Sequence, residues 1–228
     1  MTLMVLIGVL GIIGVMLLVR AVRAAPTRHL ARATYLDLCV PLFTGVKKGM
    51  AETGFARLSG HYRGQMFDVQ VVPDSLNLRK LPTLWLLVTL VDRVPVAGTY
   101  NVMLRATGIE TFSKFGTLPE LSNVPAKFPE GCTIRSDIPG PLPSAPVIAR
   151  YLGGLDPARL KELVVAPTGV RVVWLVEEAD RGRYLIYRDA EMGGQALSPV
   201  VLQPLMDGLC GLWAGLEAEA APKLRVVG

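Results

Sequence analysis

Three side chains of catalytic type fall close together in the segment Phe55–Val72, namely Ser59, His61 and Asp68. In contact, a serine, a histidine and an aspartate can form a nucleophilic triad in which the histidine takes the proton of the serine hydroxyl. Such a serine needs an exposed position, commonly on a sharp turn, with donors nearby for the oxyanion. No GxSxG pattern surrounds Ser59. A solvated strand face therefore explains these residues better than catalysis does.

Other residue types that act as nucleophiles or metal ligands are few and scattered. The chain has two histidines and three cysteines, Cys39, Cys132 and Cys210, without a CxxC pair. Isolated cysteines of this kind are usually small buried hydrophobes. A Walker loop, a dinucleotide fingerprint, an HExxH motif and a kinase signature are all missing from the sequence. We therefore predict no catalytic residue, no metal site and no cofactor, and a protein that is not an enzyme.

The residues around Ser59 have the pattern of a β-hairpin with one polar face. A two-residue turn at Arg63-Gly64 places apolar residues of the two strands on the same face, because side chains alternate along a strand. The predicted cross-strand pairs are Tyr62–Gln65, Gly60–Phe67, Leu58–Val69 and Ala56–Val71. The other face carries Ser59, His61 and Asp68, as expected where an antiparallel sheet meets water.

Hairpin and helix patterns alternate in clusters along the rest of the chain. Predicted strands lie at residues 84–91, 100–105, 110–115 and 132–135, with a second hairpin of residues 170–177 and 183–188. Predicted helices begin near Pro26, at Thr44, near Ala145, at Asp156-Pro157 and at Ser198-Pro199, and a stiff proline-rich connection covers residues 138–146. This pattern predicts an α+β domain with a mainly antiparallel sheet and packed helices.

An unbroken apolar run, Leu3–Val19, precedes that domain. As a helix it would extend about 25 Å, which is enough to cross most of a bilayer core at a tilt. We therefore predict a transmembrane anchor with a basic flank at residues 1–25 and a soluble domain at residues 26–228. The alternative is a cleaved signal peptide that exports the domain. Arg20 and Arg23 disfavour it, because they lie between the apolar run and the small residues at Ala24-Ala25.

The basic charge of the chain is concentrated beside this run. The net charge is +5, and four arginines, Arg20, Arg23, Arg28 and Arg32, precede the first acidic residue. The remaining chain is close to neutral, so it lacks the basic surface that nucleic-acid binding requires. The positive-inside rule predicts that the N-terminus lies outside and the C-terminal domain in the cytoplasm, at the cell inner membrane. The same arginines would contact anionic lipid.

Glycines recur every three residues in the apolar run, at Gly8, Gly11 and Gly14. Small residues let membrane helices approach closely, which predicts a face that packs with other membrane subunits. The open alternative is that these glycines are ordinary composition of a membrane helix.

These observations lead to two hypotheses about function. The first is a non-enzymatic, single-pass accessory or assembly protein of the bacterial inner membrane, whose helix packs with membrane subunits and whose cytoplasmic domain binds a protein partner. The second is a membrane-tethered enzyme or lipid-binding domain with a site assembled from distant residues. A deep pocket with converging polar groups would favour the second hypothesis.

Overall fold

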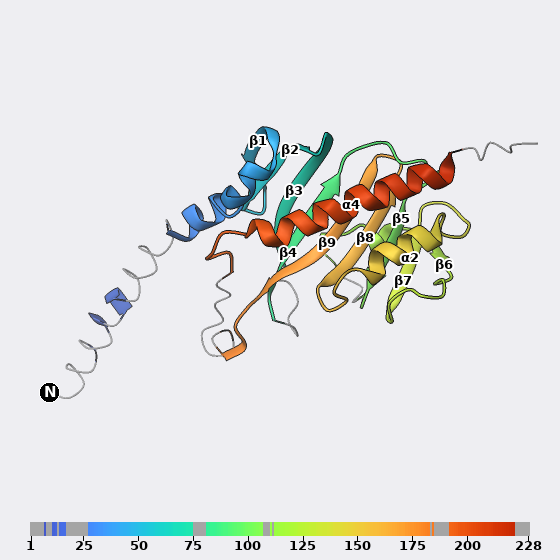
Figure 1. Ribbon diagram of the computed structural model, residues 1–228. Helices are drawn as coiled ribbons and strands as arrows, with labels where there is room; N and C mark the ends of the chain where they lie inside the picture. The colour runs from blue at the N-terminus through green and yellow to red at the C-terminus, as the bar shows by residue number, and fades with distance from the viewer. Residues whose placement is uncertain are drawn as a thin grey trace, which may run out of the picture.

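The body of the protein is a single antiparallel sheet with helices on one face (Figure 1). This computed structural model describes residues 7, 11–12, 14–16, 27–74, 81–106, 110, 112–182, 184 and 192–221. Within them the sheet has nine strands in the order β1-β2-β3-β4-β9-β8-β5-β7-β6. The strands are β1 (Thr44–Met50), β2 (Ala56–Tyr62), β3 (Gln65–Asp74), β4 (Thr83–Leu90), β5 (Tyr100–Leu104), β6 (Glu120–Ser122), β7 (Cys132–Ser136), β8 (Leu160–Ala166) and β9 (Gly169–Glu178).

The hairpin of β2 and β3 has the predicted turn and register. Arg63 and Gly64 both have positive φ, 51° and 82°, and positive φ at both central residues is the signature of a type I′ turn. The register pairs Tyr62 with Gln65, Gly60 with Phe67 and Leu58 with Val69, which confirms three of the four predicted pairs. Dihedral preference at the turn and the apolar pattern of the strands therefore agree.

The centre of the sheet is β4 paired with β9, and both strands are covered on both faces. Residues of β4 such as Leu86 and Val88 lie in the main core under the helices, whereas Trp85 and Leu87 form a second cluster with Val173 on the opposite face. This two-sided burial explains why residues 84–91 show no alternation, and it confirms the predicted central strand.

Two helices cover one face, α2 (Ala145–Gly153) and α4 (Pro199–Ala220). Ser198 begins α4 as predicted, because its hydroxyl accepts a hydrogen bond from the Val200 N–H. Two glycines of α4 face α2: an added Cβ would lie 2.9 Å from the Tyr151 ring at Gly208 and 2.7 Å from Val147 at Gly215.

Several predicted elements differ from the structure. Residues 44–53 were predicted as a helix, but Thr44–Met50 is the edge strand β1. The helix predicted to carry Leu160 and Leu163 is strand β8, because a short apolar run fits either period. Residues 110–115 do not extend the sheet where they are described: they precede the 3-10 turn η2 (Phe115–Thr117). The predicted edge strand at 132–135 is β7, which pairs on both sides. The predicted partner strand at 183–188 lies outside the described residues, except for Tyr184.

The predicted fold class, an α+β domain behind a transmembrane helix, is wrong. The described chain is mostly antiparallel sheet, with few helices. None of its described helices combines the length and the apolar character that crossing a bilayer requires. This finding overturns the predicted transmembrane helix, the single-pass topology, the membrane keywords and the inner-membrane localisation with a cytoplasmic domain.

Candidate functional site

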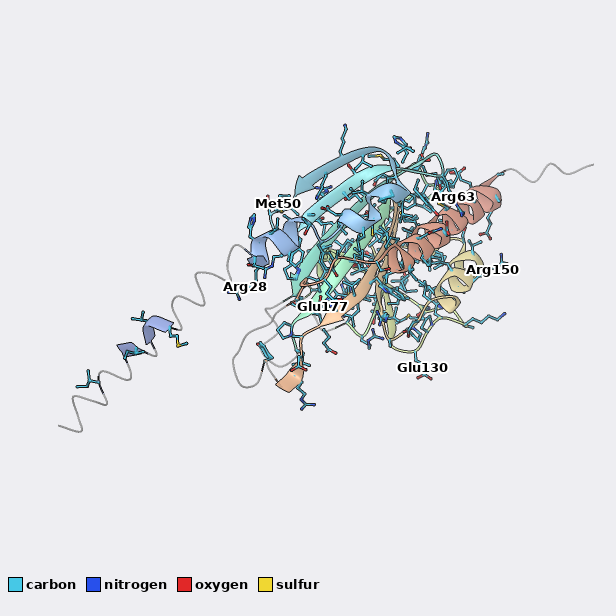
Figure 2. All side chains as sticks on the ribbon, turned by 60° about the vertical axis from the view of Figure 1, so that its left-hand side comes forward. Arg28, Met50, Arg63, Glu130, Arg150 and Glu177 are labelled. Carbon is cyan, nitrogen blue, oxygen red and sulfur yellow. The ribbon has the colours of Figure 1, made fainter. Side chains whose placement is uncertain are left out.

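A cavity of about 800 Å³ opens between the helical residues 27–33, the end of β9 and the start of α4. Its volume lies in the range of small-molecule sites. Figure 2 shows Arg28 and Glu177 at this end of the molecule, away from Arg150 on α2. The apolar part of the lining consists of Ala31, Val176, Met192, Ala196, Leu197 and Val201.

Helical spacing brings the basic side chains of the N-terminal segment to this cavity. Arg28, Ala31, Arg32 and Tyr35 all line it, and residues three, four and seven positions apart lie on one side of a helix. The helix ends just beyond, and the 3-10 turn η1 (Asp37–Leu42) carries the chain into the sheet. Two arginines four residues apart therefore face the same space.

Arg32 is the most unusual of these residues. Its guanidinium carbon lies 5.2 Å from the centroid of the Phe55 ring, a cation–π contact. Within the described part of the chain, its Nε is buried but has no hydrogen-bond partner. A buried polar group without a partner is costly, and a charged one more so. The cavity thus has a cation with unused hydrogen-bonding capacity in its wall.

Residues 192–198 form the opposite wall and are tied to the rest of the fold by backbone hydrogen bonds. The Gly193 N–H donates to Glu177 Oε2 at 2.8 Å. The Leu197 N–H donates to the Tyr35 carbonyl at 2.7 Å, and the Cys39 thiol donates to the Leu197 carbonyl at 3.3 Å. Because these bonds come from both ends of the loop, its shape does not depend on a ligand.

Gly193 is required where it stands. Its φ is +75°, in the left-handed region, and an added Cβ would lie 2.5 Å from Phe55 Cε1. The loop therefore packs directly on the ring that Arg32 covers. Phe55 in turn meets the Tyr35 ring edge-on, with centroids 5.7 Å apart. One aromatic pair supports both walls of the cavity.

Two titratable groups beside the cavity, Tyr35 and Cys39, stay protonated at neutral pH. Burial, followed by the negative charge of Glu177 and then Cys39, raises the pKa of Tyr35 well above its usual value. Burial raises the pKa of the Cys39 thiol to about 11. Neither group is therefore an anion, and neither has the lowered pKa that an activated nucleophile needs. The arrangement suits binding more than proton transfer.

The predicted site residues are distributed unevenly over the described chain. Arg28 and Arg32 both line the cavity, while Arg20, Arg23 and Gly8 lie outside the described residues. An added Cβ at Gly11 or Gly14 would meet nothing within 4 Å, and the packing role of the three glycines stays a prediction, as does the contact of the arginines with anionic lipid. Sequence reasoning missed Tyr35, Glu177 and Gly193. The spacing of Arg28, Arg32 and Tyr35 was a usable signal, whereas Glu177 and Gly193 join the site only through the fold.

The Ser59, His61 and Asp68 side chains share one sheet face, with Ser59 opposite Asp68. Asp68 is held by Arg57, whose Nε donates to its Oδ1 at 2.6 Å. This contact occupies the carboxylate that a triad would need to orient the histidine. Among the described residues, no group of three histidine, cysteine or carboxylate side chains is arranged to hold a metal ion.

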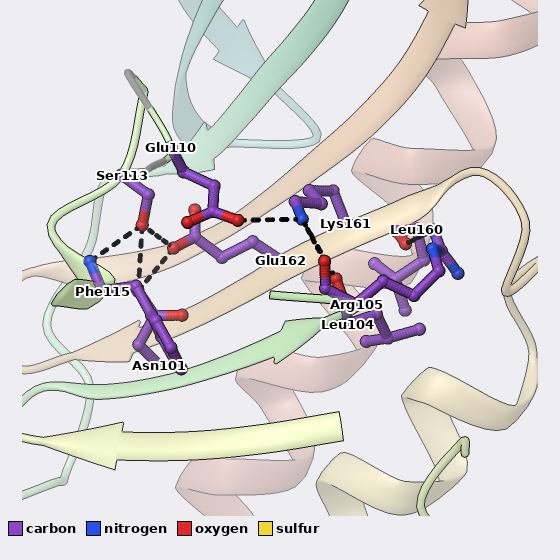
Figure 3. A network of polar contacts seen from close by, with 9 residues as sticks. All are labelled: Asn101, Leu104, Arg105, Glu110, Ser113, Phe115, Leu160, Lys161 and Glu162. Atoms are coloured by element: carbon purple, nitrogen blue, oxygen red, sulfur yellow. Dashed lines mark hydrogen bonds and ion pairs between the residues drawn. The ribbon is translucent and has the colours of Figure 1, made fainter. Parts of the chain in front are cut away.

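A second polar cluster lies on the sheet face opposite the helices (Figure 3). Glu162 accepts hydrogen bonds from Asn101 and Ser113, and Lys161 Nζ lies 3.2 Å from Glu110 Oε1. Glu162 and Lys161 are only 1% and 6% exposed. Burial raises the pKa of Glu162. Apart from Asn101 Oδ1, which is buried without a partner among the described residues, these groups bond one another inside the protein, and we assign them to holding the segment around residues 110–115 on the sheet.

Comparison with known proteins does not assign the chain to a family. Neither the models of protein families nor the curated proteins match the chain. The function is therefore argued from the cavity and its residues alone.

Proposed function

We propose that the protein is a non-enzymatic binding domain whose ligand occupies the cavity between residues 27–33, β9 and α4. The observation that carries this proposal is the Nε of Arg32, which is buried without a partner among the described residues, in the wall of a cavity of about 800 Å³. A loop fixed by its own hydrogen bonds forms the other wall, so little ordering is required when a ligand binds. The protonated Tyr35 and Cys39 beside it supply no nucleophile and no base.

Nile red, an uncharged dye whose emission depends on polarity, tests this proposal. It is expected to bind wild-type protein saturably at one site. Ala31→Trp adds a large ring to the wall and is expected to abolish that binding. Ala218→Trp places the same ring on an exposed position of α4 and is expected to leave binding unchanged. Equal dye binding by both variants would show that the cavity is not the site.

A second candidate function, the binding of a protein partner, is favoured by the edge strand β1. Among the described strands its only neighbour is β2, and six of its seven residues are exposed. An open edge accepts an extended segment through backbone hydrogen bonds, and Lys47 on this strand favours an acidic one. A photo-crosslinker at Met50 is expected to capture a protein that the same group at Arg150 does not. Identical products from both positions would count against this candidate.

A further inference from the structure

We infer that the ligand of the cavity is an amphiphilic anion, with an oxyanion head at Arg32 and an apolar body against the remaining wall. This inference rests on the proposed function, since it names the chemistry of the same site. Its basis is the match between what the wall offers and what such a molecule requires.

The head group follows from the unused donors of Arg32. A guanidinium presents its N–H groups in a planar fork that fits a carboxylate or phosphate. In the described chain no carboxylate forms an ion pair with Arg32, and its Nε is buried without a partner. An oxyanion at this position would satisfy both the donor and the charge.

The charge balance of the lining also favours an anion over a cation. Arg28 has an interaction of its own, so the positive charge that counts here is that of Arg32, and the one carboxylate among the described lining residues is that of Glu177. Glu177 already accepts the Gly193 N–H. The start of α4, at Ser198 and Val201, adds the positive end of a helix dipole to the same wall.

The body of the ligand follows from the rest of the lining. Six residues there are apolar: Ala31, Val176, Met192, Ala196, Leu197 and Val201. A small inorganic anion would leave most of a cavity of about 800 Å³ unfilled. A chain of methylene groups would gain about 0.8 kcal/mol for each group removed from water.

Displacement of bound Nile red by four amphiphiles with the same twelve-carbon chain tests the inference. Dodecanoate and dodecyl phosphate carry the two oxyanions, dodecanol is neutral and dodecyltrimethylammonium is a cation. The first two are expected to displace the dye at concentrations about 10- to 100-fold lower than dodecanol, which is the effect of a hydrogen bond to a charged group. Their ranking distinguishes a carboxylate from a phosphate ligand. Acetate and inorganic phosphate, without the chain, are expected to displace little.

Arg32→Gln should remove the preference for anions while leaving dodecanol unaffected. Arg32→Lys keeps the charge and should retain part of the preference, and Arg150→Gln on the exposed side of α2 should retain all of it. The melting temperature without ligand, measured for each variant, shows whether loss of the Arg32 contact with Phe55 has affected the fold.

The outcomes separate this inference from the proposed function. Equal displacement by dodecanoate and dodecanol, or an anion preference that survives Arg32→Gln, would overturn the anionic ligand and leave the binding cavity in place. The strongest displacement by dodecyltrimethylammonium would overturn it in favour of a cation. Nile red that does not bind wild-type protein at the cavity would overturn both proposals.

Discussion

Replacing Gly193 by alanine tests whether the loop at residues 192–198 is held as the structure describes. The residue has φ of +75°, and an alanine in that region costs about 1–2 kcal/mol. The added Cβ would lie 2.5 Å and 2.9 Å from two ring carbons of the fully buried Phe55. Forcing such a ring to move costs about 1–3 kcal/mol. Alanine also lowers the conformational entropy of the unfolded chain, which offsets about 0.4–1 kcal/mol of this loss in stability.

The net expectation is a loss of about 1–4.5 kcal/mol in the free energy of unfolding. For a domain of this size that corresponds to a fall of about 2–18 °C in melting temperature. Urea unfolding followed by circular dichroism measures it. Because Phe55 also stacks on Arg32, ligand binding should weaken in the same variant.

The neighbouring glycine supplies a matched control. An added Cβ at Gly194 meets nothing within 4 Å, so Gly194→Ala should change stability by less than about 0.5 kcal/mol. If the two variants lose the same stability, neither the positive φ nor the contact with Phe55 restricts position 193, and the account of this wall is refuted.

Three further expectations concern the buried polar cluster and the helix pair. Burial raises the pKa of Glu162, so the stability that Glu162 contributes is complete at low pH and is lost as pH rises through its folded-state pKa. The stability advantage of Glu162→Gln over wild type in urea should therefore grow between about pH 4 and pH 8. A constant difference would contradict this expectation. Lys161→Met leaves the Glu110 carboxylate buried without its ion-pair partner Lys161 and should lower the free energy of unfolding by about 3–5 kcal/mol. The double variant Lys161→Met with Glu110→Leu should recover most of that loss. Equal losses of stability in the single and the double variant would exclude the ion-pair explanation. In Gly215→Ala the added Cβ would lie 2.7 Å from Val147, whereas in Gly211→Ala it meets nothing within 4 Å. Gly215→Ala should therefore be about 1–3 kcal/mol less stable than Gly211→Ala. Equal melting temperatures would show that α2 can move away without loss of stability.

Local signals made part of the fold predictable. The dipeptide Arg63-Gly64 and the alternation on both sides of it specified one hairpin with its register. Ser198-Pro199 and the spacing of Leu202, Leu205 and Leu209 likewise specified the start and the buried side of the last helix. In each case the turn or capping chemistry and the apolar period pointed to the same structure.

Such signals did not determine the secondary structure of short apolar segments. Leu160 and Leu163 satisfy a helical period, yet pairing with β9 and β5 makes them part of a strand. The edge strand β1 contains two glycines and two lysines, a composition in which no strand period is visible. An apolar run of sufficient length, Leu3–Val19, suggested a transmembrane helix that the described helices do not bear out.

The candidate site was predictable only on its helical side. Arg28 and Arg32 were identified among the four arginines of the basic flank, for another role, and their spacing of four residues fits one side of a helix. Glu177 and Gly193 come to the cavity from 145 or more positions farther along the chain, and no local pattern predicts a contact of that separation. Sites assembled across a sheet in this way require the fold before they can be identified.

The central pairing of β4 with β9 also has a consequence for how the chain reaches this fold. The Nε of Arg171 on β9 donates a hydrogen bond to the Thr89 hydroxyl on β4, and the two residues are 82 positions apart in the sequence. Sheets built from such non-local pairs fold in milliseconds to seconds, more slowly than helical bundles. Until residues 169–178 leave the ribosome, β4 has an open edge and two uncovered apolar faces, which is a condition that favours aggregation. The risk of aggregation during synthesis therefore depends on how soon residues 169–178 are translated after β4.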